Sequence, residues 1–534
     1  MEEQIYVPEF DSLKFGVRKL GKPHEPNEIV GLHVERGTDG YATKVFQSDG
    51  RVYLMPEDLR AFLTTEDPRV FFVRDRDLEP VLKYLGEEAC RQLLLGFGVL
   101  YDGVQLFYHS SLQIRVAGGR TLKKVYSLKP FFWPTMLPDD MDCYSVQAHG
   151  ERIVKLLVGW GIPLRLNSTG SLLGELYSRA VPYEAAKMAY NCYHGGWIEM
   201  FKVGYFEEAF DYDLASAYPT EAARLVDLDG MWVRSRDWVQ AAEYGFCYAR
   251  IRMSIDLPFS PLIFRRKSVM RGGVPYRVIL NPVGVWDGYI VKDEIEFVVS
   301  SGIGEVEIID GWWFVPRDRV WFPFRAQMEN LKKLKEDSKK RGDEVAATLV
   351  KLQAAALQGK FMQSNLVRGE WTTGAAFCPV YASTITARVR CKVAEVALQN
   401  SDSIIGTVVD GLLSTRRLSV HQGWKLEYAG RCVAANHGDY WIEGRETKRN
   451  LLRDLTDYRW STKYPLRSER FISLAEAIRV DGFEAAGRVA PEAWQRVSKI
   501  GKRWWERTPK VCEDLLTNVY TSGAPFPCGV LGLD

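Results

Sequence analysis

A short hairpin signal near residue 410 sets the strongest limit on how this chain can fold. The apolar run Ile404–Val409 is followed by Asp410-Gly411 and then by Leu412-Leu413. An Asp-Gly pair between two apolar, strand-forming runs is the strongest local signal for a β-hairpin. We therefore predict two antiparallel strands with Asp410 at their tip. Taken alone, the pattern leaves open that Asp410 only makes the turn.

A second acidic segment precedes this hairpin signal. Asp213 lies 197 residues before Asp410, within the segment Phe210–Thr220. The residues before it predict a strand with Asp211 and Asp213 at its end. Pro219 then predicts that the chain leaves the direction of the strand. Phosphoryl transfer with paired Mg²⁺ ions needs carboxylates that are held rigidly on a sheet. The two segments together predict such a site, although either acid could also simply cap the end of an element.

Residues 324–361 carry the pattern of two helices joined by a tight turn. From Phe324 onward, apolar residues recur at helical spacing until Arg341-Gly342-Asp343. Asp343 has the residue type of an N-cap for a second helix, and Gly359 is a natural terminator. We predict an antiparallel helical hairpin. Its first arm and tip carry a basic run, which a solvated face would also explain: Lys332, Lys333, Lys335, Lys339, Lys340 and Arg341.

Composition limits the class of protein. A chain of 534 residues has room for several domains of the usual size. Lys and Arg total 70 against 68 for Asp and Glu, so the net charge of +2 makes no global case for a polyanionic partner, and any nucleic-acid surface must be local. Nine cysteines without a Cys-x-x-Cys pair argue against a disulfide framework or a structural metal. With no basic leader and no long apolar run, we expect a cytoplasmic protein without membrane segments.

In order and spacing, these segments resemble the polymerase motifs of family B DNA polymerases, especially the protein-primed subgroup of phages and linear plasmids. Tyr193-His194-Gly195-Gly196 is similar to that group's Tyr-x-Gly-Gly element. Motif A of the family, Asp-x-x-Ser-Leu-Tyr-Pro, is matched by Asp213, Ser216, Tyr218 and Pro219, with Ala217 in the leucine position.

Two further motifs match in part. The fingers motif Lys-x-x-x-Asn-Ser-x-Tyr-Gly-Lys-Phe is met by Lys351, Gly359, Lys360 and Phe361, and Asp410 matches the second aspartate of motif C. The interval of 59 residues between Lys351 and Asp410 is short for the strand-displacement insertion of the subgroup. The 138 residues between Asp213 and Lys351 leave room for its other insertion, the one linked to terminal-protein contact.

The resemblance implies a DNA-directed DNA polymerase that adds dNTPs to a primer 3′ end with two Mg²⁺ or Mn²⁺ ions. Its implied setting is the bacterial or archaeal host of a phage or mobile element, and its partners are primer–template DNA and dNTPs, with a terminal protein or other replication proteins left open. Tyr218 would lie beneath the incoming sugar and select deoxynucleotides. The residues assigned to catalysis and metal binding are Asp213 and Asp410, with Leu214 as a further metal contact. Those assigned to the nucleotide are Leu214, Ser216, Tyr218, Lys339, Lys351 and Gly359, and those assigned to DNA are Tyr193, Gly195, Gly196, Lys360 and Tyr440.

Several positions depart from the family pattern. In the fingers motif, Ala355-Ala356 replaces Asn-Ser and Gln358 replaces the tyrosine. In motif C, Val408 replaces the first aspartate, and the best candidate for the downstream Lys-x-Tyr element, Gly438-Asp439-Tyr440, has no lysine. These departures leave two other functions open: a non-catalytic DNA-binding relic, and a primase-like polymerase that needs no primer.

The first 190 residues resemble the exonuclease domain of the family without its acids. Proofreading there uses four carboxylates that begin with Asp-x-Glu, and the equivalent segment here is His33-Val34-Glu35. A second region keeps Asp75 and Asp77 but not the motif, and the segment 144–149 has no acid. Histidine is a poor Mg²⁺ ligand, so Glu35 alone cannot assemble a two-metal site. We predict that the protein does not proofread.

These features predict an α+β multidomain chain: a right-hand polymerase of palm, fingers and thumb behind an N-terminal RNase H-like domain of exonuclease type. The expected parts are a degenerate exonuclease-like domain (1–190), the first part of the palm with an insertion (191–322), the fingers hairpin (323–362), the second part of the palm (363–450) and the thumb (451–534). The prediction of a thumb is based on basic residues that alternate with tryptophans: Lys499, Lys502, Arg503, Arg507 and Lys510 with Trp494, Trp504 and Trp505. The alternative is that these tryptophans form the core of a domain.

Overall fold

The computed structural model of the chain describes residues 9–15 and 28–444, except for 161–180 and short gaps at 76, 95–96, 109–110, 117–119, 133–135, 139, 203, 255, 272–273, 282, 318–319, 368–369, 375, 421–422 and 437–438. The predicted thumb, 451–534, lies outside the described residues. The chain forms two compact units. The first unit contains the described residues within 7–179 and 323–378, and the second contains those within 180–322 and 379–444.

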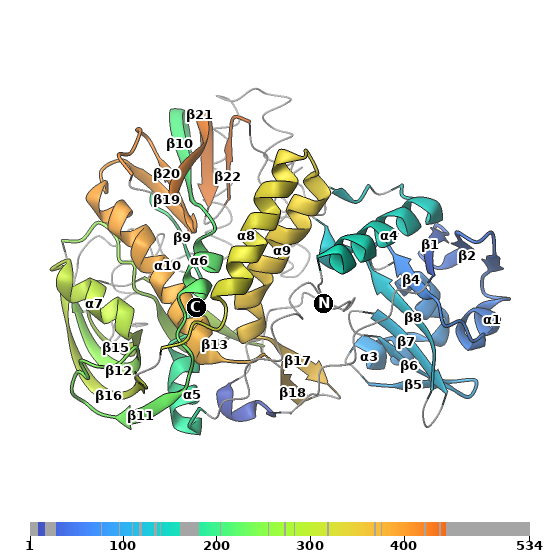
Figure 1. Cartoon of the computed structure of the whole chain (residues 1–534), viewed down its shortest axis with the longest axis horizontal. Coiled ribbons are helices and arrows are strands. Elements are labelled where there is room, and N and C mark those ends of the chain that lie inside the picture. The colour runs from blue at the N-terminus through green and yellow to red at the C-terminus, as the bar shows by residue number, and fades with distance from the viewer. Residues whose placement is uncertain are drawn as a thin grey trace. The chain divides into compact units, whose positions relative to one another are not determined.

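The first unit is built around an eight-stranded sheet (Figure 1). Its strands are β1 (Ile29–Arg36), β2 (Ala42–Gln47), β3 (Val52–Leu54), β4 (Val70–Val73), β5 (Val99–Tyr101), β6 (Val104–Tyr108), β7 (Ser111–Val116) and β8 (Thr121–Ser127). They lie in the order β3-β2-β1-β4-β8-β7-β6-β5. β4 runs parallel to both β1 and β8, whereas the other neighbouring pairs are antiparallel.

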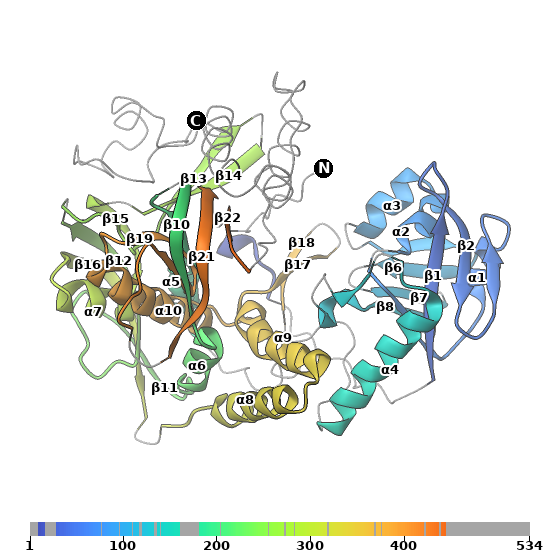
Figure 2. The same ribbon diagram turned by 90° about the horizontal axis from the view of Figure 1, so that it is seen from above.

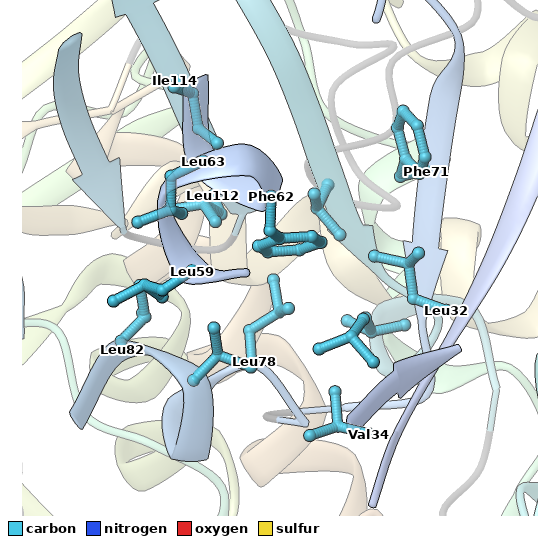
Figure 3. Close-up of a cluster of buried hydrophobic side chains, with 14 of the residues drawn as sticks. Leu32, Val34, Leu59, Phe62, Leu63, Phe71, Leu78, Leu82, Leu112 and Ile114 are labelled. Atoms are coloured by element: carbon cyan, nitrogen blue, oxygen red, sulfur yellow. The ribbon is translucent and has the colours of Figure 1, made fainter. Parts of the chain in front are cut away.

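Helices pack on both faces of this sheet. They are α1 (Leu59–Thr64), α2 (Glu79–Leu82), α3 (Glu87–Leu94) and α4 (Cys143–Gly159), with the short 3₁₀ helices η2 (Lys83–Leu85) and η3 (Lys129–Phe131). A further 3₁₀ helix, η1 (Phe10–Ser12), lies near the start of the described chain. On one face, Leu32, Phe62 and Phe71 belong to a buried apolar core (Figure 3). On the other face, α4 approaches β1 so closely that a Cβ on Gly31 would lie 1.9 Å from the carbonyl oxygen of Cys143. β1 is therefore a central strand buried on both faces, as its apolar run predicts.

The predicted helical hairpin is confirmed. α8 (Arg325–Lys340) and α9 (Glu344–Phe361) lie side by side (Figure 2). The side chain of Asp343 caps α9 by accepting a hydrogen bond from the backbone N–H of Ala346 at 3.0 Å. The prediction that Gly359 ends this helix is wrong, because α9 continues to Phe361, whose buried ring packs against Phe324. A two-stranded ribbon follows, β17 (Ser364–Val367) with β18 (Glu370–Thr373).

The second unit contains a six-stranded sheet that is covered on one face by a long helix. The strands are β9 (Trp197–Met200), β10 (Gly204–Leu214), β19 (Ile404–Val409), β20 (Gly411–Ser414), β21 (Trp424–Asn436) and β22 (Asp439–Ile442), in the order β22-β21-β10-β20-β19-β9. Val389 and Val393 of α10 (Pro379–Gln399) pack against Tyr212 and Leu412 of the sheet. A smaller apolar cluster, which includes Leu413, lies on the opposite face.

A second, antiparallel sheet completes this unit. Its strands are β11 (Gly230–Arg234), β12 (Tyr244–Met253), β15 (Gly284–Val291) and β16 (Gly304–Pro316), in the order β11-β16-β12-β15, and β13 (Phe264–Arg271) pairs separately with β14 (Val274–Leu280). The remaining helices are α5 (Tyr183–Asn191), α6 (Ala217–Ala223) and α7 (Lys292–Ser300). Among the described residues, no helix combines the length and apolar character needed to cross a bilayer.

Candidate active site

The end of β10 and the tip of the β19–β20 hairpin lie next to each other. Asp213 is the Cα partner of Gly411 in the antiparallel pairing of β10 with β20. The backbone N–H of Leu214 donates a hydrogen bond to the carbonyl oxygen of Asp410 at 2.9 Å. The fold therefore brings together the two aspartates that the sequence separates by 197 residues.

The turn of this hairpin differs from the prediction by one residue. Val408 pairs with Gly411, so the turn residues are Val409 and Asp410 rather than Asp410 and Gly411. The glycine lies in the strand instead, where a Cβ on Gly411 would make a tight contact of 3.0 Å with the carbonyl oxygen of Tyr212. Val409 consequently takes a φ of +64°, which β-branched residues rarely adopt. Such strain persists where the surroundings fix the backbone, and it is frequent at functional sites.

The segment after Asp213 turns directly into α6. Ser216 has a left-handed φ of +53° immediately before the helix. Tyr218 and Pro219 lie in its first turn, where proline has no intrahelical hydrogen bond to lose. Burial raises the pKa of Tyr218, and the negative charge of Asp410 raises it further. The phenol therefore lies within electrostatic reach of Asp410.

The Tyr193–Gly196 segment packs against this site through its last glycine. A Cβ on Gly196 would lie 2.7 Å from Cγ1 of Val409 and 3.0 Å from the hydroxyl oxygen of Tyr218. At Gly195, by contrast, no described heavy atom outside its immediate chain neighbours comes within 4 Å of the same position. The second glycine of the element is thus required by close packing, and the first is not.

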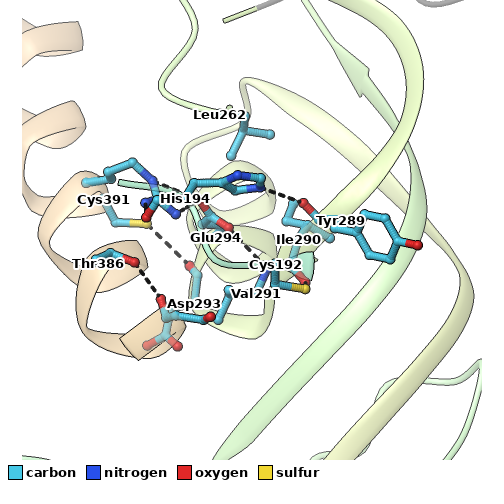
Figure 4. A network of polar contacts seen from close by, with 12 residues as sticks. Cys192, His194, Leu262, Tyr289, Ile290, Val291, Asp293, Glu294, Thr386 and Cys391 are labelled. Carbon is cyan, nitrogen blue, oxygen red and sulfur yellow. Dashed lines mark hydrogen bonds and ion pairs between the residues drawn. The ribbon is translucent and has the colours of Figure 1, made fainter. Parts of the chain in front are cut away.

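A buried ion pair supports this segment from behind. Arg390 of α10 and Glu294 of α7 are 1% and 2% exposed, and their charged groups are 2.6 Å apart. Arg390 also donates hydrogen bonds to the carbonyl oxygens of His194 at 2.9 Å and Gly195 at 2.7 Å. Figure 4 shows Glu294 and His194 within this network. Buried charges are tolerated only when they are paired and hydrogen-bonded, so the guanidinium must keep these partners. Its hydrogen bonds to two successive carbonyl groups therefore fix the path of the loop. No sequence pattern predicted this support, although Arg388 and Arg390 stand out among the valines and alanines of α10.

The predicted triphosphate-binding lysines lie on the helical hairpin, in the first unit. Lys339 is in the last turn of α8 and Lys351 is near the middle of α9, and both are exposed. Gly359 is exposed near the end of α9. Lys360 is half-buried and donates a hydrogen bond to the side-chain oxygen of Gln363 at 2.8 Å, and burial lowers the pKa of Lys360.

Tyr440, predicted to contact DNA, is buried. Only 4% of the residue is exposed. Its hydroxyl donates a hydrogen bond to the Oδ2 atom of Asp211 at 2.9 Å. The structure thus buries this tyrosine on β22, with its hydroxyl bonded to the strand that carries Asp213, across the intervening strand β21.

The three acids that the sequence offers for a proofreading site do not form a group in the described structure. Glu35, Asp75 and Asp77 each lie beside a cation: Lys44 at 3.6 Å, Lys129 at 2.8 Å and Arg36 at 3.2 Å, respectively. In the part of the chain that the structure describes, no three His, Cys, Asp and Glu side chains are grouped as a metal site. Glu35, Asp75 and Asp77 therefore do not form a metal site in the described structure, and the absence of proofreading stays a prediction.

Solved structures with a similar fold are polymerases. Phi29 DNA polymerase complexed with primer–template DNA and incoming nucleotide matches with a TM-score of 0.56 and 16% identity, covering 78% of this chain and 87% of that chain. The orthorhombic crystal form of the same enzyme gives a TM-score of 0.57 at 16% identity over 79% and 89%. Its complex with single-stranded DNA gives 0.55 at 14% identity over 79% and 90%. No sequence-family model matches the chain, and no curated protein does. The chain shares the fold of phi29 DNA polymerase, and its resemblance to protein-primed family B DNA polymerases is confirmed at the level of fold.

Proposed function

We propose that this chain is a DNA-directed DNA polymerase that adds deoxynucleotides to the 3′ end of a primer. One observation carries the proposal: Asp213 and Asp410 meet at the end of β10 and the tip of the β19–β20 hairpin, in a fold shared with a DNA polymerase. Asp213 lies on a strand and Asp410 lies in a two-residue turn between paired strands, and phosphoryl transfer depends on such rigid placement.

The donor set suits Mg²⁺. This ion is bound in polymerase-type sites by one or two carboxylates together with substrate phosphates, and it keeps several waters. Asp213 and Asp410 would supply the carboxylates, and the main chain of Leu214, hydrogen-bonded to Asp410, lies next to both. Two such ions, when bound, would stabilise the negative charge on the attacking and leaving oxygens. The role of the chain itself is to fix the two carboxylates in register.

The rest of the site would position the substrates. Tyr218, on the first turn of α6, would lie beneath the sugar and leave no room for a 2′-hydroxyl. Lys339 and Lys351 would neutralise the triphosphate as point charges. In this assignment the second unit is the palm and the α8–α9 hairpin is the fingers. The sheet of the first unit, with its β3-β2-β1-β4-β8 order, is the RNase H-like domain without its exonuclease acids.

Primer extension tests the proposal. The purified protein should extend a primed DNA template with dNTPs and Mg²⁺ or Mn²⁺, and Asp213→Asn or Asp410→Asn should abolish extension. Asp237→Asn, which changes an exposed aspartate of the same unit, is the matched control. Wild-type extension by either active-site variant would show that the metal ligands are assigned wrongly. DNA binding without extension would favour the non-catalytic relic that Val408 and Gln358 suggest, and synthesis on an unprimed template would indicate a primase-like enzyme.

A further inference from the structure

Asp211 is a buried acid on the strand that carries Asp213. It is 3% exposed and lies two residues before Asp213 on β10. Side chains at positions i and i+2 of a strand point to the same face, so both acids belong to one face of the sheet. Val408, which stands where the resembled family has an acid, packs against the apolar cluster on that same face. Asp211 is therefore a buried acid beside an apolar cluster.

Tyr440 is the partner that makes this burial tolerable. Its hydroxyl donates to Oδ2 of Asp211 at 2.9 Å, and its ring belongs to the apolar cluster. Burying a polar group costs free energy unless it is hydrogen-bonded. The fold is therefore most stable when the two side chains keep the geometry of this hydrogen bond. The other buried members of the cluster are Ala209, Ile405, Leu413, Cys432, Ala434 and Ile442.

The hydrogen bond lies beside an irregularity in the sheet. In the pairing of β10 with β21, Asp211 is opposite Tyr428 but Tyr212 is opposite Leu426, so Glu427 is an extra residue. A β-bulge leaves the ladder locally disrupted and bends the strand that carries it. Because β21 lies between β22 and β10, the bond from Tyr440 to Asp211 crosses the bulged strand and joins the strands on its two sides.

We propose that Asp211 and Tyr440 form a positioning pair that fixes the last residues of β10, and with them the carboxylate of Asp213. Tyr440 acts through Asp211 and does not contact DNA. Neither residue is a metal ligand, in keeping with the finding that Asp211 does not form a three-acid group with Asp213 and Asp410 in the described structure. This inference rests on the proposed function of Asp213.

The test compares metal affinity, DNA affinity and turnover in the full-length protein. Mn²⁺ binding is measured by electron paramagnetic resonance in the absence of DNA and dNTPs, so this readout needs no activity. Tyr440→Phe should weaken Mn²⁺ binding by about tenfold or more and lower kcat by a similar factor, as is usual when a residue that orients a metal ligand is lost. The dissociation constant for primer–template DNA should stay within about twofold.

Two further variants make the comparison specific. Asp211→Asn keeps an oxygen that can accept the hydrogen bond, so it should keep more Mn²⁺ affinity than Asp211→Leu. Tyr381→Phe is the matched control, because Tyr381 is also buried in the same unit and its hydroxyl donates to the carbonyl oxygen of Val226. This control should leave Mn²⁺ affinity and kcat unchanged.

The outcomes separate the possible roles of Tyr440. If Tyr440→Phe weakened DNA binding but kept Mn²⁺ affinity and kcat, the tyrosine would be a DNA contact and the inference would be wrong. If it behaved like Tyr381→Phe in every measurement, the pair would be merely structural, which also overturns the inference. If the wild-type protein bound Mn²⁺ but did not extend primers, the proposed function would fail, while the effect of Tyr440→Phe on Mn²⁺ binding would still decide whether the pair positions Asp213.

Discussion

Gly196 and Val409 are packed so closely that only glycine fits at position 196. A Cβ there would lie 2.7 Å from Cγ1 and 3.0 Å from Cα of Val409. Val409 is the residue with a strained φ of +64°, and it directly precedes Asp410. The Tyr193–Gly196 segment therefore holds the hairpin tip from one side, while the hydrogen bond from Leu214 holds it from the other. These two contacts explain how the strained turn persists.

Gly196→Ala should impair catalysis, because the added methyl group must displace Val409 and with it Asp410. Overpacking of this kind costs about 1–3 kcal/mol. If that strain is felt in the transition state, the rate of primer extension should fall by about ten- to hundredfold. Gly195→Ala is the control, since its methyl group would meet no described atom within 4 Å. Equal rates for the two alanine variants would contradict the role assigned to Gly196.

Tyr218→Val should admit ribonucleotides. The ring is half-buried and its hydroxyl lies close to the backbone of Gly196, so in the proposed site the ring would form a fixed surface beneath the sugar. Valine is smaller and would leave room there for the 2′-hydroxyl of a ribonucleotide. Tyr218→Phe keeps the ring and should keep the discrimination. The measurement is the ratio of kcat/KM for a dNTP to that for the matching rNTP, and an unchanged ratio in the valine variant would rule out this role for Tyr218.

Local patterns predicted local structure well in this chain. The N-cap at Asp343 and the position of Asp410 at a hairpin tip both depend on neighbouring residues, and both are confirmed. The exact turn was not predicted, because Gly411 pairs with Asp213 of β10, and a contact with such a distant strand leaves no local signal. The bond between Tyr440 and Asp211 joins residues that are more than two hundred positions apart, and no periodicity in either segment signals it.

The buried pair of Arg390 and Glu294 should be necessary for stability. Removing one partner of a buried ion pair leaves the other charge uncompensated and costs about 3–5 kcal/mol. We therefore expect Glu294→Gln to lower the free energy of unfolding by that amount, measured by denaturant titration. Glu296→Gln on the same helix is the control: Glu296 is half exposed and pairs with Lys292 at 3.0 Å, so its loss should cost only about 0–1 kcal/mol. Similar losses in the two variants would refute the structural role of Glu294.

Glu199 should make stability depend on pH. Burial raises the pKa of Glu199 on β9 to about 8, from an ordinary value of 4.5, although the hydrogen bond from the Trp197 indole opposes part of this shift. Because the folded state favours the protonated acid, its stability should be fully retained below pH 4.5 and be lost progressively as the pH rises toward 8. Glu199→Gln removes the titration but keeps an acceptor for Trp197. Its Tm should match the wild type near pH 4.5 and exceed it at pH 9, and a variant no more stable than the wild type at pH 9 would show that Glu199 is not protonated in the fold.

The protein should not shorten DNA from the 3′ end. Cleavage by two metal ions needs several carboxylates around the scissile phosphate. In the first unit, Glu35 lies 3.6 Å from Lys44, and His33, in the place of the expected aspartate, has its Nδ1 atom 2.9 Å from the carbonyl oxygen of Met141. End-labelled single-stranded DNA, incubated with Mg²⁺ or Mn²⁺ and without dNTPs, should therefore remain intact. Progressive shortening that disappears in Glu35→Ala would show that acids from elsewhere complete the site. Intact DNA, combined with primer extension by the same preparation, would show that the polymerase cannot remove its own errors. The sheet of the first unit would then have a structural role.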